Sequence, residues 1–378
     1  MSTDVGSKRS LLILFSVIVL DLIGFGVVMP ILPFYAKQYG ANATIVGLLL
    51  TSYSAMQFLF SSVWGKISDK IGRKKVLLLT IAGSALSLTL LGLANSLLLL
   101  FVGRLLSGTF AANISVASAY VTDVTTEENR TKGMGMIGAA FGIGFLLGPA
   151  LGGVLSRYGY HVPILTAAAL SAVNLFYAFL HLPEPAHHHH VVEKIRTKLL
   201  ENPAILKLCV VNLVFTLAVT QLESTFAFFM MQRYSYDAIH VSYILAMMAL
   251  IMVGIQGGLI RTLSQRYGEV LLLAAGALMM VVAFASVPLS PTVALLLLPL
   301  GLASVGRAIG QPSMMSIVSK KSPPHMRGSV MGTFQASASL GRVVGPVIAG
   351  YLFDQSMPLP YYLAGGLMLV VFAMSIGL

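Results

Sequence analysis

"NRTKGMGMIGAAFGIGFLLGPALGG" (residues 129–153) aligns without a gap on "MRGSVMGTFQASASLGRVVGPVIAG" (residues 326–350), at an offset of 197. The positions shared by the two stretches include one arginine, one lone glycine and one Gly-Pro pair: Arg130 and Arg327, Gly144 and Gly341, Gly148 and Gly345, Pro149 and Pro346. Because the offset is about half of the 378-residue chain, the repeat predicts two copies of one fold.

The composition is too apolar for a soluble protein. Hydrophobic residues make up 57% of the chain and charged residues only 10%, against a usual charged fraction of about 25%. A soluble domain with so few charges could not cover its surface, so we expect an integral membrane protein. Cys209 is the only cysteine, which excludes a disulfide within the chain.

Apolar runs long enough to cross a bilayer occur throughout the sequence. They lie near residues 10–36, 44–65, 76–95, 97–121, 132–155, 162–181, 204–231, 239–261, 270–288, 292–318, 326–352 and 359–378. Only helices and closed barrels satisfy the backbone in lipid, and these runs lack the alternation of barrel strands. The sequence therefore predicts an all-α integral membrane protein with 12 transmembrane helices.

One long polar linker, residues 182–203, divides these spans six and six. We expect an N-terminal six-helix bundle (1–181), a cytoplasmic linker (182–203) and a C-terminal six-helix bundle (204–378). An even number of spans in each half keeps the two copies in the same orientation. Parallel halves with a site between them near the bilayer midplane are typical of alternating-access transporters.

The positive charges predict the orientation. If the N-terminus is cytoplasmic, 18 of the 24 Lys and Arg residues lie on the cytoplasmic side, as the positive-inside rule requires. We therefore expect a multi-pass protein of an inner or plasma membrane with both termini in the cytoplasm. The same placement of charge in short loops argues against nucleic-acid binding, despite the net charge of +11.

Four stretches resemble signatures of one family. "GKISDKIGRK" (65–74), between the second and third spans, resembles the loop pattern Gly-x-x-x-Asp-Arg/Lys-x-Gly-Arg-Lys of the major facilitator superfamily, and "GFLLGPALGG" (144–153) resembles its fifth-helix pattern Gly-x-x-x-Gly-Pro-x-x-Gly-Gly. "LDLIGFGVVMP" (20–30) and "GRLLSGTFAA" (103–112) are similar to patterns of its drug/proton antiporters. The resemblance covers essentially the whole chain and is strongest to the tetracycline-resistance-like branch. It implies two pseudo-symmetric six-helix bundles and proton-linked export.

The resemblance implies that residues 65–74 form a gate. We expect Asp69 to dock at the start of the eleventh helix, near Arg327, where the helix dipole and unpaired N–H groups favour an anion. Arg73 is placed to pair with Asp123. The complete set of expected gate residues is Gly65, Asp69, Gly72, Arg73, Lys74, Asp123 and Arg327. The alternative is a topology signal, in which the basic residues only hold the loop in the cytoplasm.

The second half carries a diverged copy of this loop, "RTLSQRYGE" (261–269). Gln265 stands where the aspartate would be. An uncharged amide interacts more weakly with a helix dipole than a carboxylate does. We therefore expect a weaker lock in the second half.

Asp21 lies about 16 Å into its helix, near the bilayer midplane. An intramembrane carboxylate is costly, so a functional role is the first interpretation. Arg104 enters from the other side to a similar depth, and the two could pair until a conformational change lets Asp21 take up a proton. The alternative is a static ion pair that joins the first and fourth helices.

Glu223, in the seventh helix, is the other candidate acid. It is a second protonation site, an acidic contact for a cationic substrate, or an interface residue bonded to its neighbours. Arg342 and Arg307 are candidate counter-ions, and the sequence does not rank them.

Small residues and prolines in the fifth and eleventh helices predict tight helix contacts. The motif residues are Gly144, Gly148, Pro149, Gly152, Gly345 and Pro346. Together with Gly341, they suggest a symmetric seal against the second and eighth helices. In antiporters that the chain resembles, this region is thought to prevent leak.

Polar residues within the spans are candidates for a substrate pocket: Tyr53, Gln57, Asn113, Gln221, Gln256, Gln311, Gln335 and Arg342. Each one alone is equally explained by a hydrogen bond between helices. Together, with few fixed charges among them, they indicate a mostly apolar pocket suited to a lipophilic or amphipathic solute.

Several functions are disfavoured. No nucleotide-binding Gly-rich loop, zinc spacing or hydrolase serine motif is present in the sequence, so we expect neither an enzyme nor ATP-driven transport. Residues 187–190 are four histidines without a second ligand cluster, and we expect no metal and no cofactor other than protons. We therefore predict a monomeric proton-coupled exporter of a lipophilic or amphipathic compound. The alternatives are a lipid or glycolipid flippase of the same fold and a non-transporting membrane sensor or assembly partner.

Overall fold

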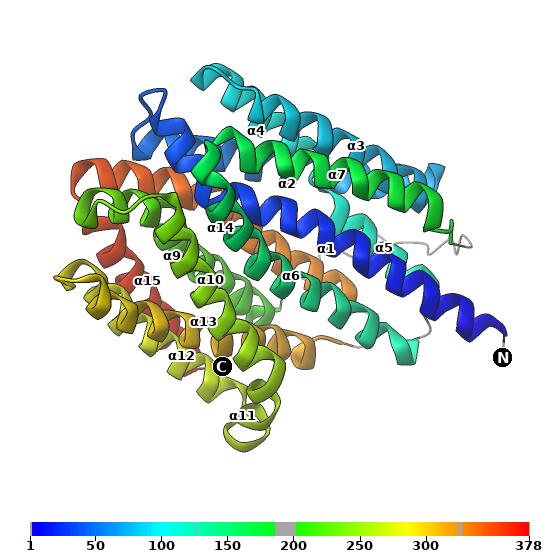
Figure 1. The fold of residues 1–378 in the computed structure, drawn as a ribbon. Helices are drawn as coiled ribbons and strands as arrows, with labels where there is room; N and C mark the ends of the chain where they lie inside the picture. Colours follow the sequence, from blue (N-terminus) through cyan, green and yellow to red (C-terminus); the bar gives the residue numbers. More distant parts are fainter. Residues whose placement is uncertain (1, 126, 186–201, 324–326, 378) are drawn as a thin grey trace. The chain divides into compact units, whose positions relative to one another are not determined.

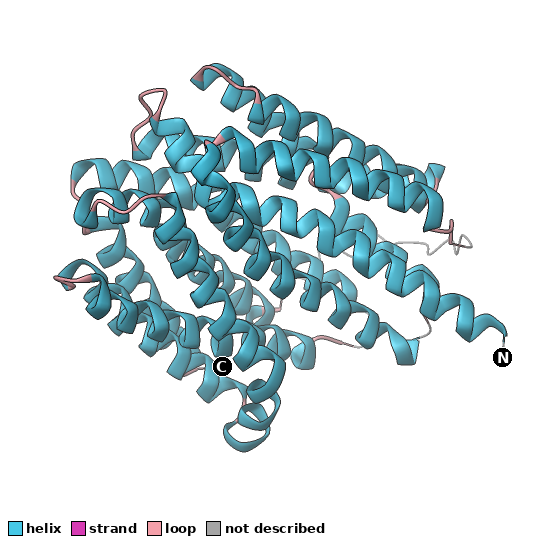
Figure 2. Ribbon diagram, in the orientation of Figure 1, coloured by secondary structure: helices cyan, strands magenta, loops and turns pink. Residues whose placement is uncertain are grey.

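The computed structural model describes residues 2–125, 127–185, 202–323 and 327–377. All regular structure in these residues is helical, and short loops join the helices (Figure 2). Within the described residues, eleven helical segments are long and apolar enough to cross a membrane, and α15 (Leu359–Ser375) is a shorter apolar helix of 17 residues. The expected all-helical membrane fold is therefore confirmed.

The first six spans are built from α1 (Ser2–Lys37), α2 (Ala43–Ile71), α3 (Arg73–Gly92), α4 (Leu97–Phe110), α5 (Asn113–Val124), α6 (Glu127–Leu155), η1 (Ser156–Tyr158) and α7 (His161–His181). One span, Leu97–Val124, contains both α4 and α5, because the helix breaks at Ala111 and Ala112. Ser96 begins this span as an N-cap, since its hydroxyl accepts a hydrogen bond from the Leu99 N–H.

The remaining spans are built from α9 (Pro203–Tyr234), α10 (Ala238–Gly254), the π-helix η2 (Ile255–Leu259), α11 (Ile260–Tyr267), α12 (Glu269–Ser286), η3 (Val287–Leu289), α13 (Val293–Lys321), α14 (Arg327–Gln355) and α15. Here α10, η2 and α11 form one span. Asn202 caps α9, with Pro203 at its first position, and Thr292 caps α13.

The chain divides into two compact units. The first comprises Met1–Ala41, Ser52–Val191 and Asp237–Ala246, and the second comprises Asn42–Thr51, Val192–Tyr236 and Met247–Leu378. The division thus passes through two helices: the first turns of α2 group with the second unit, and the first turns of α10 group with the first unit. The domain boundaries predicted from the sequence did not include this grouping of the first turns of α2 and α10.

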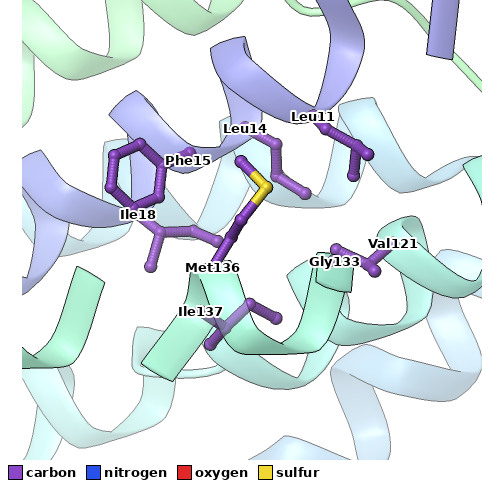
Figure 3. Close-up of a pocket in the computed structure, with 8 residues that line it drawn as sticks. All are labelled: Leu11, Leu14, Phe15, Ile18, Val121, Gly133, Met136 and Ile137. Carbon is purple, nitrogen blue, oxygen red and sulfur yellow. The ribbon is translucent and has the colours of Figure 1, made fainter. Parts of the chain in front are cut away.

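In the first unit, α1 packs against α6 and α7, and α3 packs against α7 and α4 (Figure 1). Buried apolar residues fill the centre, among them Leu14, Leu77 and Tyr120. Where α1, α5 and α6 meet, Phe15 and Ile18 lie opposite Met136 and other apolar side chains (Figure 3). This hollow has no room for a water molecule and no polar side chain, so we interpret it as packing and not as a binding site.

In the second unit, α9 packs against α14 and α15, and α12 packs against α13 and α15. Large aromatic side chains are fully buried there, including Phe229, Phe284, Phe334 and Tyr361. Phe229 and Tyr361 meet edge to face with their ring centroids 5.1 Å apart. Both units therefore have a packed interior of their own.

Candidate functional site

Asp21 lies in the middle of α1, and its partner is Asn113. Asn113 Nδ2 donates a hydrogen bond of 2.8 Å to Asp21 Oδ1. The break between α4 and α5 explains this contact, because Asn113 is the first residue of α5 and is only 5% exposed. Its own Oδ1 is buried without a hydrogen-bond partner among the described residues. The site is therefore a carboxyl group held by a neutral amide.

Asp21 and Arg104 do not form an ion pair in this structure, so the alternative of a static pair is wrong. A pair that a conformational change separates stays a prediction. The ion pairs of the described residues do not include Asp21, and the Arg104 guanidinium lies over the Tyr53 ring, 4.2 Å from its centroid. Depth estimates from the sequence assumed an unbroken fourth helix. The break places Asn113 beside the acid instead, and the aromatic face of Tyr53 stabilises the buried arginine.

Glu223 and Arg307 form an ion pair in the second unit. Arg307 Nη1 lies 2.6 Å from Glu223 Oε1, and the side chains are 29% and 26% exposed, respectively. Of the two counter-ions left open by the sequence, the structure therefore selects Arg307. Arg342 is exposed and donates a hydrogen bond of 3.0 Å to Ser339 on its own helix, α14.

The start of α3 carries a network of charges around Arg73. Its guanidinium pairs with Asp123 at 2.8 Å, as expected, and with Asp69 at 2.5 Å. It also donates a hydrogen bond of 2.6 Å to Ser68 Oγ. Asp69 is 57% exposed. Arg327 begins α14, but its side chain lies outside the described residues, so the docking of Asp69 there stays a prediction.

Sequence reasoning missed Glu184, which follows α7. Its carboxylate accepts a hydrogen bond from the Lys74 N–H at 3.3 Å, so it adds a negative charge at the N-terminus of α3, where the helix dipole favours one. Gly72, with φ 109°, is the N-cap of that helix, and a Cβ there would lie 2.8 Å from Glu184 Oε1. Gly72 thus allows both the positive φ and the approach of the acid. A Cβ at Gly65 would meet open space.

The glycine motifs pack within their own halves and not mainly against the second and eighth helices. A Cβ at Gly144, Gly148 or Gly152 would strike α1, and a Cβ at Gly341 or Gly345 would strike α9. The expected seal is therefore wrong for these five glycines. The physical reason is that the close approach of backbones occurs between the first and fifth spans of each half.

Pro346, which belongs to the motif, does meet the second span as expected, and Gly153 of α6 meets the eighth span. A Cβ at Gly47 of α2 would strike the Pro346 carbonyl of α14, and a Cβ at Gly153 of α6 would lie 2.5 Å from Ser242 Cβ of α10. Pro149 lies inside α6, as Pro346 lies inside α14.

Asp354 was also missed. It lies in the last turn of α14, and its carboxylate accepts hydrogen bonds from Ala43 N at 3.1 Å, Thr44 N at 2.9 Å and Thr44 Oγ1 at 2.5 Å. An acid more than 300 residues away thus caps the N-terminus of α2. Only its position at the end of a repeated helix hinted at this role.

The remaining pocket candidates are scattered. Gln57 Nε2 donates to the Ala111 carbonyl at the helix break, 3.2 Å away. Gln221 is buried and donates to the Gly345 carbonyl at 3.2 Å, which is a contact between helices. Gln311 is half-buried, and Gln256 and Gln335 are exposed. Of the pocket candidates, Asn113 contacts Asp21, and Gln57 binds the carbonyl of Ala111 at the break that precedes Asn113.

In the second unit, a hollow of about 230 Å³ lies beside Glu269, between α11 and α13. It is lined by Ile260, Arg261, Ser264, Glu269, Pro312, Ser313 and Ser316. Glu269 forms an ion pair with Lys320, and the sequence pattern predicts no role for either residue. Among the described residues, no group of three or more His, Cys, Asp or Glu side chains is placed to hold a metal ion.

Comparisons with known proteins agree with this architecture. Residues 14–334 and 259–378 match the sequence profile described as Major Facilitator Superfamily. The class D tetracycline resistance protein of Salmonella ordonez is 31% identical over 347 residues, covering 89% of this chain and 88% of that protein. Multidrug resistance protein 2 of Bacillus subtilis (strain 168) is 27% identical, covering 96% of this chain and 93% of that protein.

A solved structure is similar over the full length. The crystal structure of the human organic anion transporter MFSD10 matches with a TM-score of 0.74 and 25% identity, covering 98% of this chain and 99% of that chain. The match of the family profile to most of the chain decides the assignment. The chain belongs to the Major Facilitator Superfamily and is a multi-pass membrane transport protein, not an enzyme.

Proposed function

We propose that this transporter exports lipophilic or amphipathic compounds in exchange for protons, and that Asp21 carries the proton. The observation that supports this most is the 2.8 Å hydrogen bond from Asn113 to Asp21. A cation in an ion pair would hold the carboxylate charged, whereas a neutral amide opposes protonation less. Acids inside a membrane that remain able to change charge are the usual elements of proton relays.

Asn113 can serve both protonation states of Asp21. The amide now donates through Nδ2, and its Oδ1 is buried and unpartnered among the described residues. A protonated carboxyl group becomes a donor and needs an acceptor, which an amide supplies after a turn of its side chain. Asn113 therefore needs only a local movement to provide a hydrogen-bond partner for either protonation state of Asp21.

The neighbourhood of Arg104 supports an aromatic or amphipathic substrate. Phe25 lies between Tyr53 and Phe145, with ring centroids 5.5 Å and 6.0 Å away, and Phe141 stacks on Phe145 at 6.2 Å. All four rings are partly exposed, so they offer flat apolar surface next to a buried cation. The names of the similar proteins, which refer to tetracycline, multidrug resistance and organic anions, agree with such a class.

The rest of the proposed cycle uses the gate residues. Asp69 is 57% exposed, and we propose that it docks at the start of α14 in one state of alternating access and leaves it in the other. Glu223, paired with Arg307, is a second candidate proton site. The protein works as a monomer with both termini in the cytoplasm, and protons are its only coupling ion.

Proton release on substrate binding tests this proposal. Purified protein in weakly buffered detergent, with a pH indicator, is titrated with tetracycline and with ethidium as probes. We expect at least one probe to release protons from the wild type and from Glu223→Gln, but not from Asp21→Asn. Release of equal size from Asp21→Asn would remove Asp21 from the mechanism. Translocation of fluorescent lipid without proton release would instead favour a flippase.

A further inference from the structure

The second unit contains a charge-reversed copy of the ion pair at Arg73. Glu269, the first residue of α12, stands 196 positions after Arg73, the first residue of α3. Lys320, in the last turn of α13, stands 197 positions after Asp123, in the last turn of α5. Glu269 and Lys320 form an ion pair, as Arg73 and Asp123 do. The acid and the base have changed places while the positions are kept.

The surroundings of the two pairs are also repeated. Ser68 Oγ accepts a hydrogen bond of 2.6 Å from Arg73, and its counterpart, Ser264 Oγ, donates one of 3.2 Å to Glu269. A hydroxyl group can donate or accept, so serine serves either polarity. We call Ser68, Arg73 and Asp123 the first clasp, and Ser264, Glu269 and Lys320 the second clasp.

The two clasps differ in how they meet the helix dipoles. Arg73 is a cation at the N-terminus of α3, and Asp123 is an anion near the C-terminus of α5, so both oppose the dipoles of their helices. Glu269 at the N-terminus of α12 and Lys320 at the C-terminus of α13 both comply with them. The second clasp is therefore stabilised where the first is weakened.

Burial, unlike the helix dipoles, favours the ion pair of the first clasp, but it does not decide which clasp is more stable. Arg73 and Asp123 are 12% and 6% exposed, against 17% for Glu269 and 65% for Lys320, so water screens the first pair less. The desolvation of a buried pair offsets much of that stronger attraction, however. Ser316 Oγ also donates a hydrogen bond of 3.1 Å to Glu269. At the first clasp, Asp69 also pairs with Arg73 and Glu184 accepts from the Lys74 N–H, so these acids offset part of the opposing polarity at the start of α3. The polarity of each pair relative to its helix dipoles is the difference on which the comparison of the two clasps rests.

We propose that Glu269 and Lys320 are positioning residues, whose clasp stays closed through the transport cycle and holds the turn between α11 and α12 on α13. The first clasp, whose polarity opposes its helices, is the one that opens. The loop at residues 261–269 therefore has a different role from the loop at residues 65–74. It lacks the gate aspartate, and its Glu269 instead holds the loop on α13. The transport part of this inference rests on the proposed function, but the difference in local stability does not.

Hydrogen–deuterium exchange of the full-length protein in detergent tests the stability difference. The first-turn hydrogen bonds at equivalent positions are Val76 N to Gly72 O and Leu272 N to Gly268 O. After correction for intrinsic rates, we expect the first turn of α12 to exchange about tenfold more slowly than the first turn of α3. Equal exchange of the two turns, or slower exchange in α3, would overturn the proposal.

A pair of double variants separates polarity from pairing. Glu269→Arg with Lys320→Asp keeps an ion pair but gives it the polarity of the first clasp, and we expect exchange at α12 to rise about tenfold. Glu269→Asp with Lys320→Arg keeps both the pair and its polarity, and should retain slow exchange. Slow exchange in the reversed variant would show that polarity has no role and would overturn the proposal.

The role in transport is tested with any probe that the proton-release experiment identifies. We expect the reversed double variant to lower the maximal rate severalfold with KM unchanged, while the control double variant transports like the wild type. An unchanged maximal rate in the reversed variant, together with faster exchange, would refute the positioning role alone. If no probe releases protons, the proposed function fails, and the exchange data still decide the difference between the clasps.

Discussion

The cap that Asp354 places on α2 gives the prediction whose size can best be worked out. Asp354→Asn removes the charge that receives two backbone N–H groups and the Thr44 hydroxyl. Hydrogen bonds to a charged group contribute about 1.5–3 kcal/mol each when shielded. Asp354 and Thr44 are partly open to water, so we use the usual range for a helix cap, about 1–2 kcal/mol in total. That corresponds to a roughly 5- to 30-fold increase in local opening.

Hydrogen–deuterium exchange measures this opening, because the Ala43 and Thr44 amides are the donors. In lipid nanodiscs, we expect Asp354→Asn to raise exchange at the start of α2 by about 5- to 30-fold. Asn42→Ala is the matched control, since Asn42 caps the same helix locally through the Ile45 N–H at 2.9 Å. It should affect Ile45 and leave the contact with α14 unchanged. Exchange at residues 43 and 44 that does not respond to Asp354→Asn would refute the reasoning.

Two further predictions concern packing and pH. A Cβ at Gly148 would lie 2.6 Å from the backbone of Gly26, whereas one at Gly138 in the same helix would meet nothing within 4 Å. We therefore expect Gly148→Ala to lower the free energy of unfolding by about 1–3 kcal/mol and Gly138→Ala to leave Tm unchanged. Equal Tm values for the two variants would contradict this expectation. Burial raises the pKa of Asp237, but hydrogen bonds from the backbone and side chain of His240 outweigh it and lower the pKa below its usual value. The charged Asp237 side chain therefore stabilises the fold above its unfolded pKa of about 3.9, and this stabilisation is lost as pH falls through the lower folded pKa. Asp237→Asn should therefore reduce the fall in Tm below about pH 4. A fall in Tm equal to that of the wild type would contradict this prediction.

Much of the fold was predictable because its signals are local or periodic. Runs of apolar residues gave the spans, since lipid leaves the backbone no other option. The pairing of Arg73 with Asp123 also followed from the sequence, through the resemblance of residues 65–74 to a known loop. The division of the spans into six and six at the linker of residues 182–203 stays a prediction.

The details of the site were less predictable, because they depend on contacts between distant segments. The break of the fourth span at Ala111 and Ala112 left no sequence signal strong enough to place Asn113 beside Asp21. The pair of Glu269 with Lys320 was hidden because its charges are reversed, so a comparison by residue type shows only divergence. The cap from Asp354 joins segments about 310 positions apart, which periodicity cannot reveal.

The central claim is that proton transfer at Asp21 drives export. Proteoliposomes that contain the wild type or Asp21→Asn are compared in two assays with the same compound: uptake driven by a pH gradient, and counterflow exchange without a gradient. We predict that Asp21→Asn loses gradient-driven uptake and retains counterflow, because the binding site and the movement remain while the coupling is removed. Gradient-driven uptake by Asp21→Asn at the rate of the wild type would contradict the account.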